Sequence, residues 1–203
     1  MRCYEGKPID GVVIERVLAA TLFIPDAADD THSGELRELK ERGIYAKEYA
    51  EVLIQVLRAE GVSLAVSGVI VPVLQTTPRL VPAGPIALAH ALSSVTGLRM
   101  KNTLVATREV RSQRGLGLVQ RRENRRDSMR SIDSLSGMTV YLVDDVVTTG
   151  STMLDAARAV KHAGAASAIG LAAGRDADIR SLVHAGVIRQ TLESNVDFQD
   201  ESS

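Results

Sequence analysis

Apolar runs alternate with amphipathic segments along most of the chain. The run Leu64–Leu74 is rich in valine, which is typical of a strand buried on both faces. Leu104–Ala106, Thr139–Val143 and Ala168–Ala172 are shorter apolar runs of the same kind. We therefore expect these four segments to be strands.

Helical spacing of apolar residues marks the segments between these strands. In the clearest case Tyr45, Tyr49, Val52 and Val56 recur on one helical face. Each helical pattern stops at a glycine, which is a common helix end. The predicted helices are Ser33–Arg42, Tyr45–Glu60, Pro85 to Gly97 and Thr152–Ala163. Strands that alternate with helices predict an α/β fold with a mainly parallel sheet flanked by helices, whose ligands bind outside the carboxyl ends of the strands.

Length and composition indicate one globular domain. The chain has 203 residues, of which 45% are hydrophobic and 24% charged. We expect a single domain over residues 1–190 and an acidic tail over 191–203. The stretch 108–136 lacks periodicity and is predicted to be a mobile loop. Ten basic and three acidic residues lie between Arg99 and Arg130, so this region is strongly basic.

Charge and cysteine content exclude several classes of protein. The net charge of −1 provides no general attraction to nucleic acid or membrane. Cys3 is the single cysteine, which rules out an internal disulfide and a zinc site built on paired cysteines. No apolar run approaches the roughly 20 residues of a membrane span, and the first residues lack the apolar core of a signal peptide. These features predict a cytoplasmic protein without a membrane segment.

The stretch "VYLVDDVVTTGST", from Val140 to Thr152, has the strongest chemical pattern in the chain. Asp144 and Asp145 follow an apolar strand, and a turn with several hydroxyls and Gly150 leads into the next helix. Such a turn offers backbone N–H groups, hydroxyl donors and a helix N-terminus to a phosphate. The carboxylates would repel that phosphate, so they suit sugar hydroxyls or a divalent cation. The pattern therefore predicts a ligand with a phosphate and a nearby ribose diol.

A purely structural interpretation of the same stretch is also available. Threonine-rich turns often only cap helices, and Thr152 and Asp155 have the spacing of a capping box. An aspartate at the end of a strand is often structural. The carboxylate pair, the hydroxyl cluster and the strand-to-helix context together favour the ligand site.

Val140 to Thr152 resembles the phosphoribosyl-pyrophosphate motif of the type I phosphoribosyltransferases: a hydrophobic strand, two acidic residues and a Thr-Thr-Gly-x-Thr loop. The resemblance implies that Asp144 and Asp145 hold the ribose hydroxyls of 5-phosphoribosyl 1-pyrophosphate (PRPP). It also implies a Mg²⁺ ion that bridges ribose hydroxyls and pyrophosphate, with no protein ligand directly assigned. The residues implied to surround the 5-phosphate are Val147, Thr148, Thr149, Gly150, Ser151 and Thr152.

A second segment is similar to the ComF-like members of this family. In "QRGLGLVQRREN" the residues Gln113, Leu116, Arg121 and Asn124 have the order and spacing seen there. Two features differ from that group. The N-terminal cysteine zinc module is missing, and "VPAGPIALA" stands where relatives usually have an Arg-Gly-Phe-Asn-Gln segment.

The resemblance also implies a site for pyrophosphate. Gln75 and Thr76 lie where these enzymes place a pyrophosphate loop, although an ordinary strand-ending turn is the alternative. Arg111 and Arg114 are the candidates for cationic loop residues that meet pyrophosphate, and the alternative is a solvated basic face. The implied reaction is displacement at the anomeric carbon of ribose, with catalysis by positioning and electrostatic stabilisation.

The sequence leaves the acceptor open. The expected enzyme transfers phosphoribose to a nitrogen acceptor such as a nucleobase and releases pyrophosphate. A rival interpretation is a non-catalytic accessory protein that senses PRPP or binds nucleic acid through the basic region, as the association of ComF-like proteins with DNA uptake allows. Only 3% of the residues are aromatic, which weakens the case for a base-stacking surface. Dimers are common among similar proteins, but the sequence specifies neither an oligomeric state nor a general base.

Overall fold

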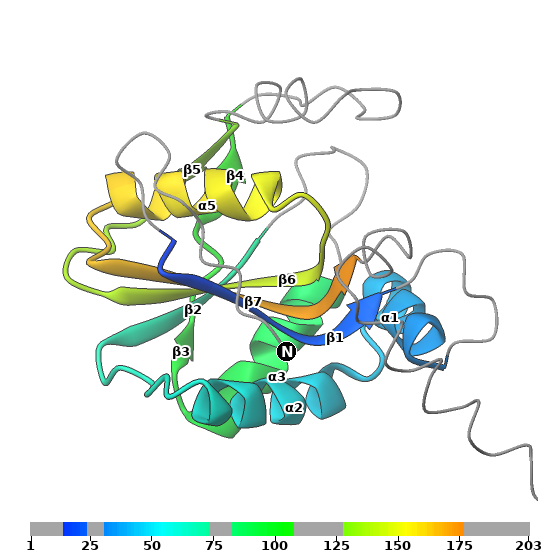
Figure 1. Ribbon diagram of the computed structural model, residues 1–203. Helices are drawn as coiled ribbons and strands as arrows, with labels where there is room; N and C mark the ends of the chain where they lie inside the picture. Colours follow the sequence, from blue (N-terminus) through cyan, green and yellow to red (C-terminus); the bar gives the residue numbers. More distant parts are fainter. Residues whose placement is uncertain (1–13, 24–30, 74–82, 108–127, 177–203) are drawn as a thin grey trace, which may run out of the picture.

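The computed structural model describes residues 14–23, 31–73, 83–107 and 128–176. Along these segments, strands and helices alternate for most of the length (Figure 1). The strands are β1 (Arg16–Phe23), β2 (Gly68–Pro72), β3 (Arg99–Met100), β4 (Leu104–Ala106), β5 (Met129–Ser131), β6 (Thr139–Val147) and β7 (Ser167–Asp176). The helices are α1 (Thr31–Arg42), α2 (Ala46–Ala59), α3 (Ala83–Thr96) and α5 (Ser151–His162).

Five of the described strands form one parallel sheet in the order β1-β7-β6-β2-β3. β6 lies in the middle, paired along its length with β7 on one side and, over Thr139–Val143, with β2 on the other. β4 and β5 form a separate antiparallel pair beside α5. The predicted fold class, a mainly parallel sheet flanked by helices, is confirmed.

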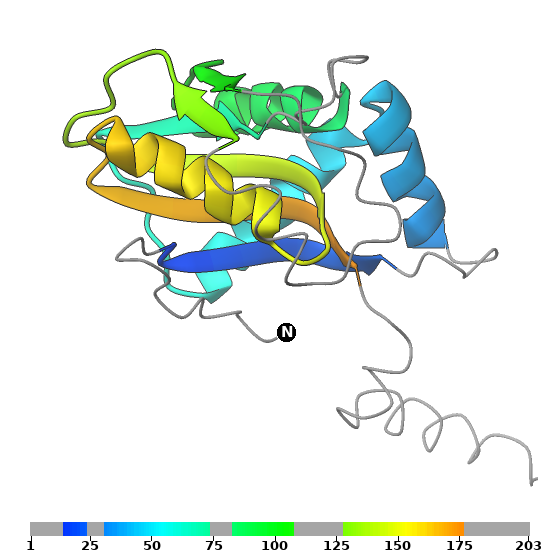
Figure 2. The same ribbon diagram turned by 90° about the horizontal axis from the view of Figure 1, so that it is seen from above.

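Helices cover both faces of the sheet (Figures 1 and 2). Along β6, Val140 and Leu142 belong to the core cluster that contains the α5 side chains. Tyr141 and Val143 belong to the cluster formed with α1, α2 and α3. This alternation follows from the two-residue period of a strand, and burial of both faces explains why β6 reads as a continuous apolar run.

Several element boundaries differ from those predicted. The apolar run Leu64–Leu74 is a strand only over Gly68–Pro72, because a turn closed by the Gly68 N–H and the Ala65 carbonyl precedes it. β6 continues to Val147 and β7 to Asp176, beyond the predicted ends of both strands. The four predicted helices are confirmed to within two residues at each end.

The sequence patterns missed three strands. β1 contains two adjacent alanines, which are weak strand formers, and it lies at the edge of the sheet. β3 and β5 have two and three residues, too few to establish a period. β5 lies inside the stretch 108–136 that showed no periodicity, and residues 128–136 of that stretch are among those described.

Candidate functional site

The two carboxylates of the motif lie inside β6 and project to opposite faces of the sheet. Asp144 is paired with Ala172 of the α5-side core, so its side chain is on the α5 face. Asp145 is on the other face, where its Cβ lies against Gly84 at the start of α3. Both side chains are buried, with 7% and 2% of the residue surface exposed. The pair is therefore divided between two layers rather than forming one cluster at the end of a strand.

Asp145 has an incompletely satisfied carboxylate. Its Oδ1 accepts the backbone N–H of Val146 at 2.6 Å, while its Oδ2 is buried and has no hydrogen-bond partner among the residues that the structure describes. A buried carboxylate oxygen without a donor is costly, which makes it a strong candidate to accept a hydrogen bond from a ligand. Asp144 accepts the backbone N–H of Asp145 on its Oδ1 at 2.9 Å.

The segment after β6 forms a short turn with donors at its tip. Thr148, Thr149 and Gly150 connect β6 to α5, and Gly150 adopts a left-handed conformation with φ of 73°. An added Cβ at Gly150 would find no atom within 4 Å, so glycine is needed there for its conformation rather than for close packing. The space beside the turn is open to a ligand.

Hydroxyl groups and the start of α5 meet at this turn. The Thr149 and Ser151 hydroxyls lie 2.5 Å apart, and Ser151 is 7% exposed. Gly150, the N-cap of α5, has no side chain to cap the helix, and Thr149 Oγ1 accepts the N–H of Ser151 at a long distance of 3.4 Å. Free N–H groups at a helix N-terminus favour an anion. Val147 precedes the turn, and its side chain lies in the α5-side core. Only its backbone is therefore available to a ligand at the turn.

The capping-box interpretation of Thr152 and Asp155 is wrong. The N-cap of α5 is Gly150, and the Asp155 carboxylate turns away to accept two hydrogen bonds from Ser128. Sequence spacing did not identify this contact, because Ser128 and Asp155 are 27 residues apart. Gly84, which packs on Asp145, was likewise not identified from the sequence.

Four predicted site residues lie outside the described residues: Gln75, Thr76, Arg111 and Arg114. The structure therefore brings together Asp144, Asp145 and the segment from Val147 to Thr152. In the described part of the chain no three His, Cys, Asp or Glu side chains form a group that could hold a metal ion. Carboxylate oxygens of the type offered by Asp144 and Asp145 are nonetheless the donors that Mg²⁺ prefers.

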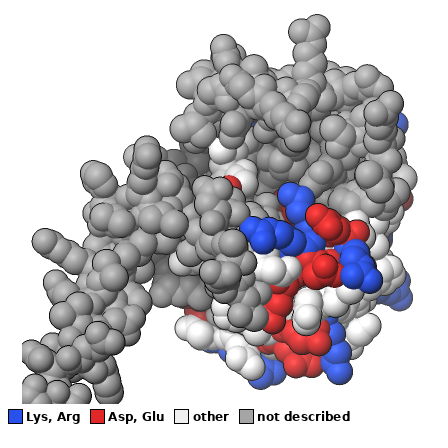
Figure 3. Space-filling model, turned by 90° about the vertical axis from the view of Figure 1, so that its right-hand side faces the viewer, with Lys and Arg blue, Asp and Glu red and all other residues white. Residues whose placement is uncertain are grey.

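The charged surface and the helix lengths can be compared with those of nucleic-acid-binding and membrane-spanning proteins. On the side where α1 lies, basic and acidic side chains are intermixed among the described residues (Figure 3). This face therefore lacks the single-sign charge typical of a nucleic-acid-binding surface, while most of the basic stretch 99–130 lies outside the described residues. None of the described helices is long and apolar enough to cross a membrane.

The described site combines a parallel sheet, two carboxylates on its middle strand, a left-handed glycine and the start of α5. Residues 81–195, more than half of the chain, match the phosphoribosyl transferase domain family. The chain belongs to this family, and the predicted class of enzyme, a phosphoribosyltransferase, is confirmed. No curated protein matches the sequence.

Solved structures of similar shape include hypoxanthine phosphoribosyltransferases. A variant in which an invariant aspartic acid is replaced by glutamic acid has 16% identity and a TM-score of 0.40, with 71% of this chain and 80% of that chain covered. A lysine-to-arginine variant of the Trypanosoma cruzi enzyme, in complex with the product IMP, has 14% identity and a TM-score of 0.40, with 71% and 76% covered.

Proposed function

We propose that this protein binds PRPP together with Mg²⁺ and transfers the phosphoribosyl group to a nitrogen acceptor, such as a nucleobase, with release of pyrophosphate. The observation that carries the proposal is the path of the chain from Asp144 to Ser151. It passes from two buried carboxylates, through a left-handed glycine at the N-cap, into helix α5 within eight residues.

The turn is the proposed site of the 5-phosphate. Thr148, Thr149, Ser151 and Thr152 supply hydroxyl groups, and the first N–H groups of α5 supply backbone donors. In the structure the Thr149 and Ser151 hydroxyls bond to each other, so both are within reach of one acceptor. A phosphate oxygen would replace that mutual contact with two charge-assisted hydrogen bonds.

The carboxylates are the proposed site of the ribose. The buried, unpartnered Oδ2 of Asp145 would accept a hydrogen bond from one ribose hydroxyl, and the Asp144 carboxylate would serve the other. Mg²⁺ fits this donor chemistry. It would take most of its oxygen ligands from PRPP and water, as is usual for this ion, and would supply charge stabilisation to the departing pyrophosphate.

Pyrophosphate and the transition state require further groups. We assign the pyrophosphate contacts to Gln75 and Thr76, and the stabilising positive charge to Arg111 and Arg114. The reaction passes through an oxocarbenium-like state at the anomeric carbon. The protein would then act by holding PRPP and acceptor in line and by stabilising charge on the leaving group.

Calorimetric titration of PRPP with Mg²⁺ into the full chain tests this proposal. The intact protein should bind PRPP, and the double variant Asp144→Asn with Asp145→Asn should lose binding. Asp133→Asn is a matched control, because Asp133 is an exposed aspartate outside the motif. Ribose 5-phosphate, which lacks pyrophosphate, should bind more weakly, through the turn and the two carboxylates without the pyrophosphate contacts.

The outcomes separate the two candidate classes. Binding that disappears in the double variant and persists in the control supports the site and justifies a screen of nucleobases as acceptors. Absence of binding by the intact protein would contradict the transferase proposal. Salt-dependent binding of oligonucleotides by the same preparation would then favour an accessory, nucleic-acid-binding role.

A further inference from the structure

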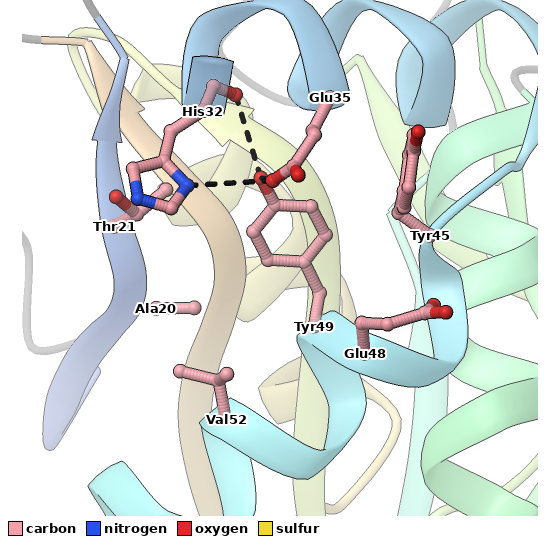
Figure 4. Close-up of a pocket in the computed structure, with 8 residues that line it drawn as sticks. All are labelled: Ala20, Thr21, His32, Glu35, Tyr45, Glu48, Tyr49 and Val52. Carbon is pink, nitrogen blue, oxygen red and sulfur yellow. Dashed lines mark hydrogen bonds and ion pairs between the residues drawn. The ribbon is translucent and has the colours of Figure 1, made fainter.

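A cavity lies on the sheet face that α1 and α2 cover, on the opposite face from α5. It has a volume of about 320 Å³ and is lined by the second half of β1 and the first halves of α1 and α2 (Figure 4). Cavities of a few hundred Å³ accommodate small organic ligands. The lining determines which ligand suits it.

The lining is acidic. Glu35 of α1 and Glu48 of α2 contribute carboxylates, and neither lysine nor arginine is among the lining residues that the structure describes. Glu35 is held in place, because its Oε2 lies 3.3 Å from Nδ1 of His32 and 3.5 Å from the hydroxyl of Tyr49. Glu48 forms no ion pair with any residue that the structure describes. Glu48 is exposed, so its carboxylate is accessible to a positively charged ligand.

Apart from the polar side chains of Thr21 and His32, the rest of the described wall is apolar or aromatic. Ala20 and Val52 contribute small apolar surfaces, and the ring of Tyr49 stands at the centre of the group in Figure 4. Tyr45 lies on the side of Glu48 and has a left-handed backbone with φ of 65°, although it is not a glycine. Tyr45 and Val52 expose 38% and 39% of their surfaces. This wall would cover the apolar body of a ligand, and aromatic rings also attract cations.

We propose that this cavity binds a small organic cation, with an ammonium or amidinium group at Glu35 and Glu48 and an apolar body against Tyr45, Tyr49 and Val52. The proposal does not depend on the phosphoribosyltransferase site, which selects anionic phosphates. Different parts of α1 lie near the cavity and near Asp145. Glu35 lines the cavity, whereas the backbone of Leu39 and Lys40 lies against Gly84, next to Asp145.

Three probes of nearly equal shape test the charge requirement. Benzamidine is cationic, benzamide neutral and benzoate anionic. Each is titrated into the full ¹⁵N-labelled chain while backbone amide shifts are followed. Benzamidine should shift the amides of α1 and α2 that line the cavity, with an affinity at least about tenfold higher than that of benzamide, as expected for a charge-assisted hydrogen bond. Benzoate should cause no shifts there.

Shape-conserving variants identify the carboxylates. Glu35→Gln and Glu48→Gln should each weaken benzamidine binding by about tenfold. Glu51→Gln is the matched control, because Glu51 is an exposed carboxylate of α2 that does not line the cavity. Equal binding of benzamidine and benzamide, shifts outside the cavity, or equal losses in Glu51→Gln would overturn the proposal. The probe comparison uses the unmodified chain, so it decides the question even if a variant does not fold.

Discussion

The Asp155 carboxylate accepts two hydrogen bonds from Ser128, one from its backbone N–H at 3.0 Å and one from its hydroxyl at 2.7 Å. Both residues are at most 1% exposed. The Ser128 carbonyl in turn accepts the N–H of Thr107 at 2.9 Å, which places these contacts at the end of the β4–β5 pair. Asp155 is one helical turn after Ser151, so one buried carboxylate joins this pair to the helix that begins at the proposed phosphate turn.

Replacement of Asp155 by alanine should destabilise the protein by about 2–4 kcal/mol, because the buried Ser128 N–H and hydroxyl lose their acceptor. Ser128→Ala removes only the hydroxyl and should lower the free energy of unfolding by about 1 kcal/mol. Urea unfolding of both variants and of the double variant measures the coupling. Additive losses would show that the two side chains do not interact as the distances indicate.

Gly150→Ala should destabilise the protein by about 1–2 kcal/mol, because L-residues are strained at a φ of 73°. It should also weaken the binding of PRPP, since relief of the strain would move the turn. Gly137→Ala is the matched control. Gly137 has a φ of 71° and open space for a Cβ, but it lies before β6.

Unfolding and calorimetry together distinguish the two effects. The control variant should lose a similar free energy of unfolding and keep the affinity for PRPP. Equal affinities in both variants would mean that the conformation of Gly150 is not required for the phosphate.

The sequence predicted the middle of the fold well and its edges poorly. Burial on both faces gives β6 and β7 a continuous apolar pattern that can be recognised without partners. β3 and β5 exist because neighbouring strands hold them, and segments of two or three residues carry no periodic signal. Edge strand β1 contains alanines whose strand conformation is imposed by pairing with β7.

The same distinction applies to the candidate site. Asp144, Asp145 and Gly150 lie close enough together in the sequence to be recognised as one motif. The contacts around this motif come from distant segments. Gly84 packs on Asp145, and Ser128 donates to Asp155 in the helix that follows the motif. Such contacts depend on packing between layers, which spacing along one chain does not encode. The division of the two aspartates between sheet faces follows from strand alternation once β6 is known to continue to Val147.

Gly84→Ala should destabilise the protein by about 1–3 kcal/mol through overpacking. The added Cβ would lie 3.0 Å from the Cβ of Asp145 and 3.1 Å from backbone atoms of Leu39 and Lys40. Gly34→Ala provides the contrast, because Gly34 is inside α1 with no atom within 4 Å of an added Cβ. In that variant the free energy of unfolding should rise by about 0.5–1 kcal/mol, because alanine has a higher helix propensity than glycine. Thermal and urea unfolding measure both, and a stabilising Gly84→Ala would contradict the close packing of α3 on Asp145.

Asp145→Asn tests whether the buried carboxylate serves a ligand or the fold. The unpartnered Oδ2 receives no hydrogen bond in the structure, and an asparagine Oδ1 can still accept the N–H of Val146. The substitution removes a buried charge but places an amide NH2 donor where Oδ2 lies without a described partner, so the two effects offset each other and the free energy of unfolding should stay within about 1 kcal/mol of the original.

Affinity for PRPP should nevertheless fall by at least about tenfold, because a charge-assisted hydrogen bond to ribose is weakened. Urea unfolding and calorimetry on Asp145→Asn, beside Asp144→Asn, measure the two quantities separately. A large loss of stability with unchanged affinity would assign Asp145 to the support of α3. The expected result, lost affinity with retained stability, would assign its free oxygen to the ligand.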